Sequence, residues 1–482
     1  MTRSPCVPEP DADVLVVGCG AAGLAAAVSA KEERPDARVV VLERSRETER
    51  GGNTRWSSAF FRVGEDLRPA DGFEDDFAAF TGGAADPGYV RRLRELAPDT
   101  LEWLAGHGVR FEMVPMFFLT ARRPRLGIAG GGGAIVERLA EAAGRLGVEF
   151  RYETTAVELL TGDDGSPTRV VGLRTTGPGG VAAELRAPAV ILASGGYEGN
   201  PQLMTEHFGE NAEFLKPVAR GGTFNRGEGI GMAIGAGAAP AGEWGNFHGE
   251  PVDPRSRIAE PVVMTFPYGI LVNADGERFV DEASSTVDEI YEDVCRAIFA
   301  QPGNISYLVG DRRLPELPGF ARAVLSDQPP YRCDTLAELA RVLDVDETAL
   351  AATVAAYNAG VPDGEPGFDP TVADGLATTG VRPPKSNWAR AVAEPPFVAY
   401  PVATAVCFTF GGIAVDTAAR VLDGDGNRID GLWAAGEMTG VYHRKYPGAT
   451  SVLRSLVFGR EAARDAVGAR SAARSPATGS GG

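Results

Sequence analysis

Four residues near the N-terminus have the types and the spacing needed to hold a dinucleotide. Gly18, Gly20 and Gly23 follow the apolar run Val14 to Val17, and Glu43 ends a second apolar run. In this arrangement the first glycine permits a tight turn, the second lets backbone approach a pyrophosphate, and the third lets a helix pack on the strand. The N-terminus of that helix offers N–H groups to the phosphates, and Glu43 is placed to accept ribose hydroxyls. The pattern therefore predicts a dinucleotide-binding unit.

Further glycines lie where other segments would reach the same ligand. Gly51-Gly52-Asn53-Thr54 follows the first unit, and Ala193-Ser194-Gly195 and Gly436-Glu437 each follow an apolar strand. Glycine at a strand end lets backbone come close to a bound group. We predict one cofactor site with these residues: Gly18, Gly20, Ala22, Gly23, Glu43, Arg44, Gly51, Gly52, Asn53, Thr54, Ala193, Ser194, Gly195, Gly436, Glu437, Ser451 and Val452.

The order of apolar runs indicates how these segments are positioned. The opening strand–helix–strand unit and the buried-strand patterns at 189–193 and 431–435 predict an α/β fold whose sheet draws on both ends of the chain. Residues from about 240 to 375 contain more proline and aromatics and give mixed strand and helix signals. We predict a first cofactor segment at 1–240, a capping or substrate domain at 241–375, a second cofactor segment at 376–470 and a disordered tail at 471–482.

Composition limits the possible partners. The net charge of −18, with no basic block, argues against binding to nucleic acid. No apolar run has the length of a membrane span and the first residues lack a signal-peptide core, so we expect a cytoplasmic protein that is not integral to a membrane. The five cysteines are scattered without a CxxC pair, and we therefore expect no metal site.

Five blocks in order resemble the FAD-dependent fumarate reductase and succinate dehydrogenase flavoprotein superfamily. They are Val14 to Gly23 with Glu43, Gly51 to Thr54, Ile191 to Gly196, Gly269 to Phe279, and Gly431 to Glu437 followed by Tyr446-Pro447-Gly448. The resemblance implies FAD in a Rossmann-like domain built from N- and C-terminal segments, with an inserted α+β capping domain. It also implies that Ser451 and Val452 present backbone N–H groups to the flavin. Since no histidine lies near Trp56 and Ser57, where covalent relatives attach FAD, noncovalent binding is expected.

Within this superfamily, several positions depart from the fumarate reductase pattern. Thr286 stands where those enzymes have a proton-donating arginine, and Val262 and Thr265 stand where they have its relay pair. Phe408 replaces a substrate-binding histidine, and Tyr446 replaces an arginine that grips a carboxylate. Fumarate reduction is therefore not the expected activity.

Other residues are more similar to tricarballylate dehydrogenase. Gly51 to Thr54 with Arg62, His248 and Tyr446 fit that enzyme type, which oxidises a CH–CH bond beside carboxylates. The Tyr446-Pro447-Gly448 block also resembles 3-ketosteroid Δ1-dehydrogenases, in which a tyrosine helps to polarise a substrate carbonyl.

Dehydrogenation of this kind needs a base, a polarising donor and groups that hold the substrate. We expect His248 and Tyr446 to act as acid, base or polarising groups, with Arg62 beside a substrate carboxylate. The expected substrate-binding residues are Tyr268, Arg444, Lys445 and Thr409. The predicted activity is FAD-dependent dehydrogenation of a CH–CH bond next to a carboxylate or carbonyl, with electrons passed to an external acceptor of unknown identity. Reduction of an unsaturated acid and ketosteroid Δ1-dehydrogenation are the alternatives.

Overall fold

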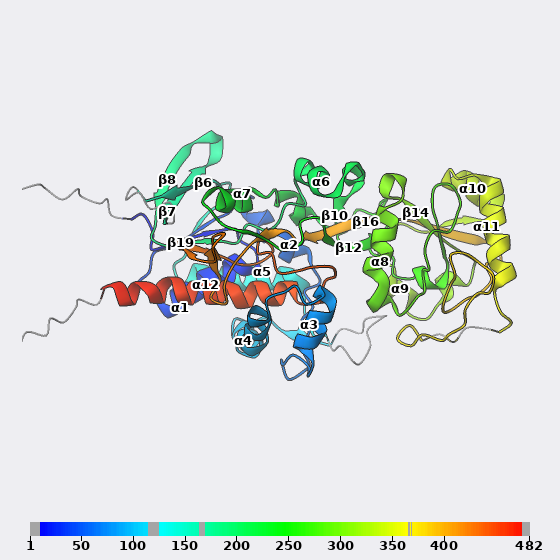
Figure 1. The fold of residues 1–482 in the computed structure, drawn as a ribbon, viewed down its shortest axis with the longest axis horizontal. Helices are drawn as coiled ribbons and strands as arrows, with labels where there is room; N and C mark the ends of the chain where they lie inside the picture. The colour runs from blue at the N-terminus through cyan, green and yellow to red at the C-terminus, as the bar shows by residue number, and fades with distance from the viewer. Residues whose placement is uncertain (1–9, 114–124, 163–168, 365–366, 368, 475–482) are drawn as a thin grey trace, which may run out of the picture.

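The computed structural model describes residues 10–113, 125–162, 169–364, 367 and 369–474, with side chains described as far as residue 468. Figure 1 shows two sheet-containing parts arranged along the long axis of the molecule. The part that carries α1 (Ala21–Glu33) and α12 (Ser451–Arg474) holds both ends of the chain, and the other part carries α8 (Val287–Phe299) to α11 (Glu347–Gly360). Long strand β16 (Phe397–Thr409) runs between them.

The first part is built on a six-stranded sheet of order β18-β19-β9-β1-β2-β5, parallel except for the edge strand β18. Its strands are β1 (Val14–Val17), β2 (Val39–Leu42), β5 (Glu149–Arg151), β9 (Val190–Leu192), β18 (Arg420–Leu422) and β19 (Arg428–Ala434). Every residue of β1, β2 and β9 is buried, as expected for parallel strands covered on both faces.

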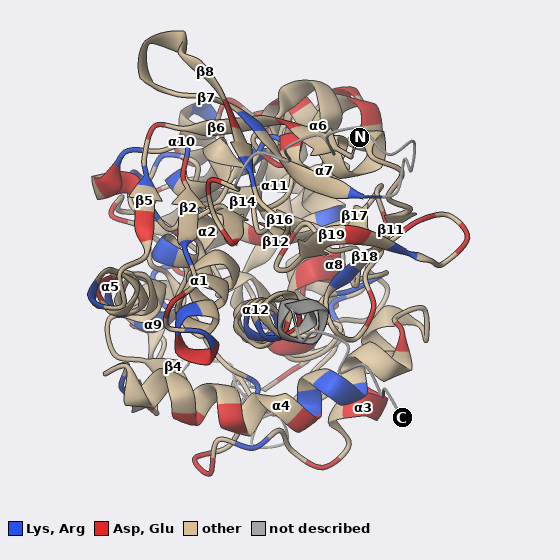
Figure 2. Ribbon diagram, turned by 90° about the vertical axis from the view of Figure 1, so that its left-hand side faces the viewer, with Lys and Arg blue, Asp and Glu red and all other residues tan. Residues whose placement is uncertain are grey.

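Helices α1 and α12 cover one face of this sheet side by side (Figure 1). Small residues allow the close approach, because a Cβ on Gly459 would lie 2.3 Å from the carbonyl oxygen of Ala22. On their outer side lies α4 (Pro87–Gly106), whose charged residues are visible in Figure 2. Asp99 on α4 accepts a hydrogen bond from Arg460 on α12 at 2.9 Å, so α4 packs on the outer side of the layer that α1 and α12 form over the sheet.

The second sheet is organised around β16. Strands β12, β14 and β15 pair with it in antiparallel fashion and β10 pairs with it in parallel, while β13 pairs with β14. These strands are β10 (Lys216–Pro217), β12 (Phe247–Val252), β13 (Ile270–Val272), β14 (Ser306–Gly310) and β15 (Tyr331–Cys333). A buried ion pair between Arg278 and Glu282, 2.7 Å long, lies beside this sheet with Lys385, so Arg278 links the predicted Gly269 to Phe279 block to these later residues.

Smaller elements complete the described chain. The remaining strands are β6 (Thr155–Thr161), β7 (Val170–Thr176) and β8 (Ala182–Arg186) in one sheet, and the pairs β3 (Phe111–Glu112) with β4 (Gly127–Ile128) and β11 (Pro240–Ala241) with β17 (Gly412–Ile413). The remaining helices are α2 (Gly52–Trp56), α3 (Phe73–Thr81), α5 (Gly131–Arg145), α6 (Pro201–Phe208), α7 (Glu228–Gly235), α9 (Phe320–Ala323) and α10 (Leu336–Leu343). None of the helices in the described ranges combines the length and the hydropathy needed to cross a bilayer.

The predicted α/β fold is confirmed, with a cofactor-type sheet formed by segments from both ends of the chain. The boundaries at residues 240 and 375 stay predictions. Strand β16 continues the second sheet as far as Thr409, well beyond the predicted return to the first part. Helix α12 reaches Arg474 and so includes the first residues of the predicted tail, whereas 475–482 lie outside the described residues.

Candidate active site

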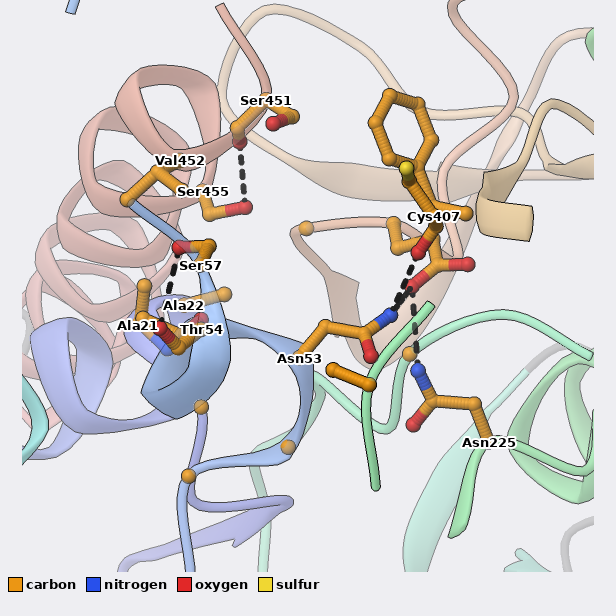
Figure 3. A pocket seen from close by; sticks show the side chains of 18 of the residues that line it. Ala21, Ala22, Asn53, Thr54, Ser57, Asn225, Cys407, Ser451, Val452 and Ser455 are labelled. Atoms are coloured by element: carbon orange, nitrogen blue, oxygen red, sulfur yellow. Dashed lines mark hydrogen bonds between the residues drawn. The ribbon is translucent and has the colours of Figure 1, made fainter. Parts of the chain in front are cut away.

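A cavity of about 600 Å³ lies between the two parts. Its lining includes the loops after β1, β2, β9 and β19, the start of α12, and residues of β12 and β16. In parallel sheets the crevice outside the carboxyl ends of the strands is the usual ligand site. Figure 3 shows part of the lining, with Asn53 on α2 directed toward Cys407 and with Ser451 and Val452 at the start of α12 on another wall.

The turn between β1 and α1 is shaped for a phosphate-containing ligand. A Cβ on Gly18 would lie 2.3 Å from the Ala193 carbonyl oxygen, and one on Gly23 would lie 2.0 Å from the Gly18 carbonyl oxygen. A side chain at Gly18 would push the turn away from the segment after β9, and a side chain at Gly23 would push α1 away from the turn. Gly20 lines the cavity as the residue before α1, so the N-terminus of this helix faces the ligand space.

Glu43 is buried at the end of β2, and backbone N–H groups hold its carboxylate. Oε2 accepts a hydrogen bond from the Cys19 N–H at 3.0 Å, and Oε1 accepts one from the Ser45 N–H at 2.8 Å. Each carboxylate oxygen can accept more than one hydrogen bond, so both retain capacity for hydroxyl donors. This oriented carboxylate fits the ribose of a dinucleotide.

A buried amide–carboxyl network joins three of the segments that line the cavity. Glu198 Oε1 accepts hydrogen bonds from Asn53 Nδ2 at 2.6 Å and Asn225 Nδ2 at 2.7 Å, and Glu437 Oε2 accepts one from Asn225 Nδ2 at 3.2 Å. Burial raises the pKa of both carboxyl groups, and the negative charge of Glu437 further raises that of Glu198. The network holds Asn53 and Glu437 in place on opposite segments, while Thr409 donates its backbone N–H to Glu437 Oε1 at 3.0 Å.

The N-terminus of α12 and Tyr446 form a group of hydrogen-bond donors at the cavity wall. The Tyr446 hydroxyl accepts the backbone N–H groups of Thr450 and Ser451, each at 2.9 Å, and donates to Ser451 Oγ at 3.0 Å. The helix N-terminus adds partial positive charge at this point. We call the Tyr446 hydroxyl and these two N–H groups the donor cluster. Both N–H groups donate to the Tyr446 oxygen and thereby polarise its O–H bond, so the hydroxyl is the donor that would turn from Ser451 Oγ to stabilise negative charge on a carbonyl oxygen.

His248 lies against Tyr446, with their ring centroids 4.5 Å apart. Its Nδ1 is 2.6 Å from Glu292 Oε1, and Glu292 Oε2 accepts the Tyr446 backbone N–H at 3.1 Å. Glu292 therefore orients both residues and leaves Nε2 as the ring nitrogen available for proton exchange. Phe408 packs 5.0 Å from both rings, so the group is surrounded by aromatic surface.

Most of the predicted cofactor residues are brought together by the fold. Every predicted cofactor residue except Gly23 lines the cavity, and Gly23 instead lets α1 pack against the turn. His248 and Tyr446, the residues expected to act as acid, base or polarising groups, also line the cavity.

Three predicted substrate cations lie outside the described lining. Arg62 is buried and binds Asp76 at 2.6 Å. Lys445 Nζ is 2.6 Å from Asp293, and Arg444 is exposed with its side chain near Gly82. We therefore do not assign these cations to a substrate carboxylate.

Two further predicted substrate residues, Tyr268 and Thr409, also lie outside the described cavity lining. Tyr268 packs against Trp388, with ring centroids 5.5 Å apart, in the apolar core beside the second sheet. Thr409 acts through Glu437 and does not itself line the cavity. Phe408, which stands where relatives have a substrate-binding histidine, lines the cavity, and so does Cys19 between the first two fingerprint glycines. Asn225, Glu250, Glu260 and Tyr291 also line it and were not predicted. They stand in ordinary strand, helix or loop sequence, and the packing of α8 on β12 brings Tyr291 near Glu250.

Comparison with known proteins gives the family. The model of the FAD binding domain family matches residues 13–453. The chain is 29% identical over 479 residues to "Fumarate reductase (cytochrome)" of Shewanella frigidimarina, covering 95% of this chain and 77% of that protein.

Two solved structures are similar over almost the whole chain. The open conformation of a flavocytochrome c3 fumarate reductase matches with a TM-score of 0.77 and 26% identity, covering 96% of this chain and 79% of that one. The 3-ketosteroid-delta4-(5alpha)-dehydrogenase of Rhodococcus jostii RHA1, in complex with 4-androstene-3,17-dione, matches with a TM-score of 0.71 and 26% identity, covering 96% and 98%. The chain therefore belongs to the FAD binding domain family, within the FAD-dependent fumarate reductase and succinate dehydrogenase flavoprotein superfamily, and is an FAD-dependent oxidoreductase.

Proposed function

We propose that this enzyme oxidises a CH–CH bond next to a carbonyl group to a C=C bond. The observation that carries the proposal is the donor cluster beside His248 (Tyr446 hydroxyl with the Thr450 and Ser451 N–H groups). When bound, FAD supplies the hydride acceptor. The residues Glu43, Asn53, Glu437 and the N-termini of α1 and α12 would hold it, and noncovalent binding remains part of the proposal.

The side chains of this site suit the proton-transfer half of such a reaction. A carbonyl oxygen at the donor cluster would make the neighbouring C–H acidic, because the cluster stabilises the enolate that forms when the proton leaves. His248 would take that proton, and Glu292 would stabilise the resulting imidazolium. The β-carbon loses its hydrogen as a hydride. The substrate is left with a C=C bond, and the two electrons would reduce the bound cofactor.

The surroundings favour a ketone over a polycarboxylate. Phe408 and Tyr291 contribute aromatic surface to the cavity, and the predicted carboxylate-binding cations Arg62, Arg444 and Lys445 lie outside its described lining. Arg125 and Arg322 do line the cavity, but Arg125 forms an ion pair with Asp288 and Arg322 is exposed. Tricarballylate-like specificity, which the sequence favoured, is therefore supported less well than a carbonyl substrate. The likeness to a ketosteroid dehydrogenase over 98% of that chain agrees with this choice.

Reduction of an unsaturated acid is the second candidate, and the likeness to fumarate reductases favours it. One experiment separates the two. Holoenzyme is mixed anaerobically with a saturated cyclic ketone, and photoreduced holoenzyme is mixed with fumarate. We expect the ketone to bleach the oxidised flavin and fumarate to leave the reduced flavin unchanged. The reverse pattern would reject dehydrogenation. The transfer of electrons to an external acceptor and the cytoplasmic location remain predictions.

A further inference from the structure

Two carboxyl groups lie in contact at the edge of the cofactor sheet. Glu198 follows β9 and Glu437 follows β19, and these two strands are parallel neighbours, so both loops leave the same edge. Glu437 lines the cavity, whereas Glu198 is 3% exposed and stands behind the described lining. The two carboxyl groups are close enough to share a hydrogen bond. We call Glu198 and Glu437 the carboxyl pair.

The turn after β9 is shaped around this pair and its partners. A Cβ on Gly196 would lie 2.1 Å from Glu437 Oε1, and a Cβ on Gly195 would lie 2.4 Å from Asn225 Oδ1. Gly195 also has a φ of +77°, a backbone conformation that glycine adopts without strain. Any side chain at these two positions would displace the groups that contact the pair, so the glycines are needed for its geometry.

The four carboxyl oxygens of the pair differ in their hydrogen bonds. Glu437 Oε1 accepts the Thr409 backbone N–H at 3.0 Å, and Glu437 Oε2 accepts Asn225 Nδ2 at 3.2 Å. Glu198 Oε1 accepts Asn225 Nδ2 at 2.7 Å and Asn53 Nδ2 at 2.6 Å, and Figure 3 shows these two amides approaching from different segments. Glu198 Oε2 is buried and has no partner among the N–H and O–H groups of the described residues. Three oxygens therefore act as acceptors, and Glu198 Oε2 is the one that can carry a proton.

The surrounding charges agree with one proton on the pair. Burial raises the pKa of Glu437, and the positive charge of Arg454 opposes that shift. Burial raises the pKa of Glu198 as well, and there the negative charge of Glu437 adds to the shift. The nearby Tyr197 hydroxyl donates to the carbonyl oxygen of Trp244 at 2.7 Å and so supplies no proton to the pair. Since two ionised carboxyl groups in contact repel each other, the arrangement favours a neutral Glu198 beside an ionised Glu437.

We propose that Glu198 carries a proton on Oε2, donates it to Glu437, and thereby holds Glu437 in the position that FAD binding needs. Glu198 is thus a positioning residue, because it acts on the cofactor through Glu437 and Asn53, which both line the cavity. Loss of the proton would leave two negative charges in contact, displace Glu437 and weaken the binding of FAD. The proposal concerns the cofactor site and is the same whether the enzyme dehydrogenates a ketone or reduces an unsaturated acid.

Glutamine substitutions test which carboxyl group holds the proton. In Glu198→Gln the amide oxygen can keep both asparagine donors, and the NH₂ group can replace the O–H that points to Glu437. In Glu437→Gln the NH₂ group must face an N–H donor, because both oxygens of Glu437 already accept N–H groups. The dissociation constant of FAD is measured from the rise in flavin fluorescence when holoenzyme is diluted at neutral pH. It should stay within about threefold of wild type in Glu198→Gln and rise about tenfold or more in Glu198→Ala and in Glu437→Gln.

A pH profile and an infrared spectrum separate this proton from a purely structural role. Wild-type affinity for FAD should fall on the alkaline side, by about tenfold per pH unit once the pair loses its proton, whereas Glu198→Gln should keep its affinity there. Infrared spectra of holoenzyme at neutral pH should show a deuterium-sensitive band of a protonated carboxyl group in wild type that is lost in Glu198→Gln. Glu206→Gln, an exposed substitution on α6, should match wild type in both measurements.

Each of three results would overturn the proposal. The first is an equal pH profile of FAD affinity in wild type and Glu198→Gln. The second is an unchanged carboxyl band in Glu198→Gln. The third is the reverse order of affinities at neutral pH, with FAD held by Glu437→Gln and released by Glu198→Gln. None of these measurements uses a substrate, so failure of a ketone to bleach the flavin would reject the proposed function and leave the carboxyl pair untouched.

Discussion

Replacement of Glu43 by glutamine tests how the structure holds the cofactor. The two carboxylate oxygens accept different backbone N–H groups, from Cys19 at 3.0 Å and from Ser45 at 2.8 Å. A glutamine side chain has only one oxygen, so its NH₂ group must face one of these N–H donors. The same NH₂ group can no longer accept a ribose hydroxyl.

The expected loss of FAD affinity follows from that geometry. The missing backbone hydrogen bond affects the apoprotein and the holoenzyme alike, whereas the missing ribose hydrogen bond affects only the holoenzyme. A hydrogen bond to a charged acceptor contributes about 1.5–3 kcal/mol. The dissociation constant of FAD should therefore rise about ten- to 150-fold in Glu43→Gln.

Titration of apoprotein with FAD, followed by quenching of flavin fluorescence, measures this change. Glu149→Gln is the matched control, because Glu149 lies exposed on β5 of the same sheet and outside the described cavity lining. The control should bind FAD as wild type does. An unchanged dissociation constant in Glu43→Gln, with an unchanged circular dichroism spectrum, would refute the placement of the ribose at Glu43.

Three further predictions concern the reacting groups and the fold. Tyr446→Phe removes the hydroxyl of the donor cluster and should slow anaerobic flavin reduction by a ketone about 10²- to 10³-fold without loss of bound FAD, as stopped-flow absorbance would show. The pKa of Glu250 is raised by folding from 4.5 to about 8, so the folded state binds a proton more tightly than the unfolded state. The resulting stabilisation is lost as the pH rises from 4.5 to about 8. The melting temperature of wild type should therefore fall relative to that of Glu250→Gln across this pH range. Gly23→Ala should abolish FAD binding or folding, since its Cβ would lie 2.0 Å from a backbone oxygen, whereas Gly144→Ala on α5 has open space and should fold normally, as size-exclusion chromatography with flavin detection would show.

The cofactor half of the site could be predicted because its residues are local. Gly18, Gly20 and Glu43 belong to one strand–helix–strand unit, and their spacing alone specifies the geometry that a dinucleotide needs. Gly436 and Glu437 follow another strand of the same sheet, and parallel pairing of β19 with β9 brings them to the same edge. Short-range pattern and sheet topology together therefore determine this half.

The substrate half depends on contacts between distant segments, which sequence spacing does not reveal. Glu250 meets His248 and Cys407 because of the irregular pairing of β12 with β16, where the register shifts between His248 and Gly249. Arg62 was expected at the substrate because arginine binds carboxylates. In the structure Arg62 donates a hydrogen bond to Asp76 on α3, because the tertiary packing places α3 beside Arg62.

The central claim is that this enzyme removes hydrogen from a CH–CH bond next to a carbonyl group. The most direct test is an anaerobic single turnover of holoenzyme with cyclohexanone, followed by quantification of the enone product and of reduced flavin. The structure predicts one enone for each flavin reduced, with the yield within a fixed short time strongly lowered in Tyr446→Phe. Flavin that stays oxidised with this and other saturated ketones, together with reoxidation of the reduced enzyme by fumarate, would contradict the claim.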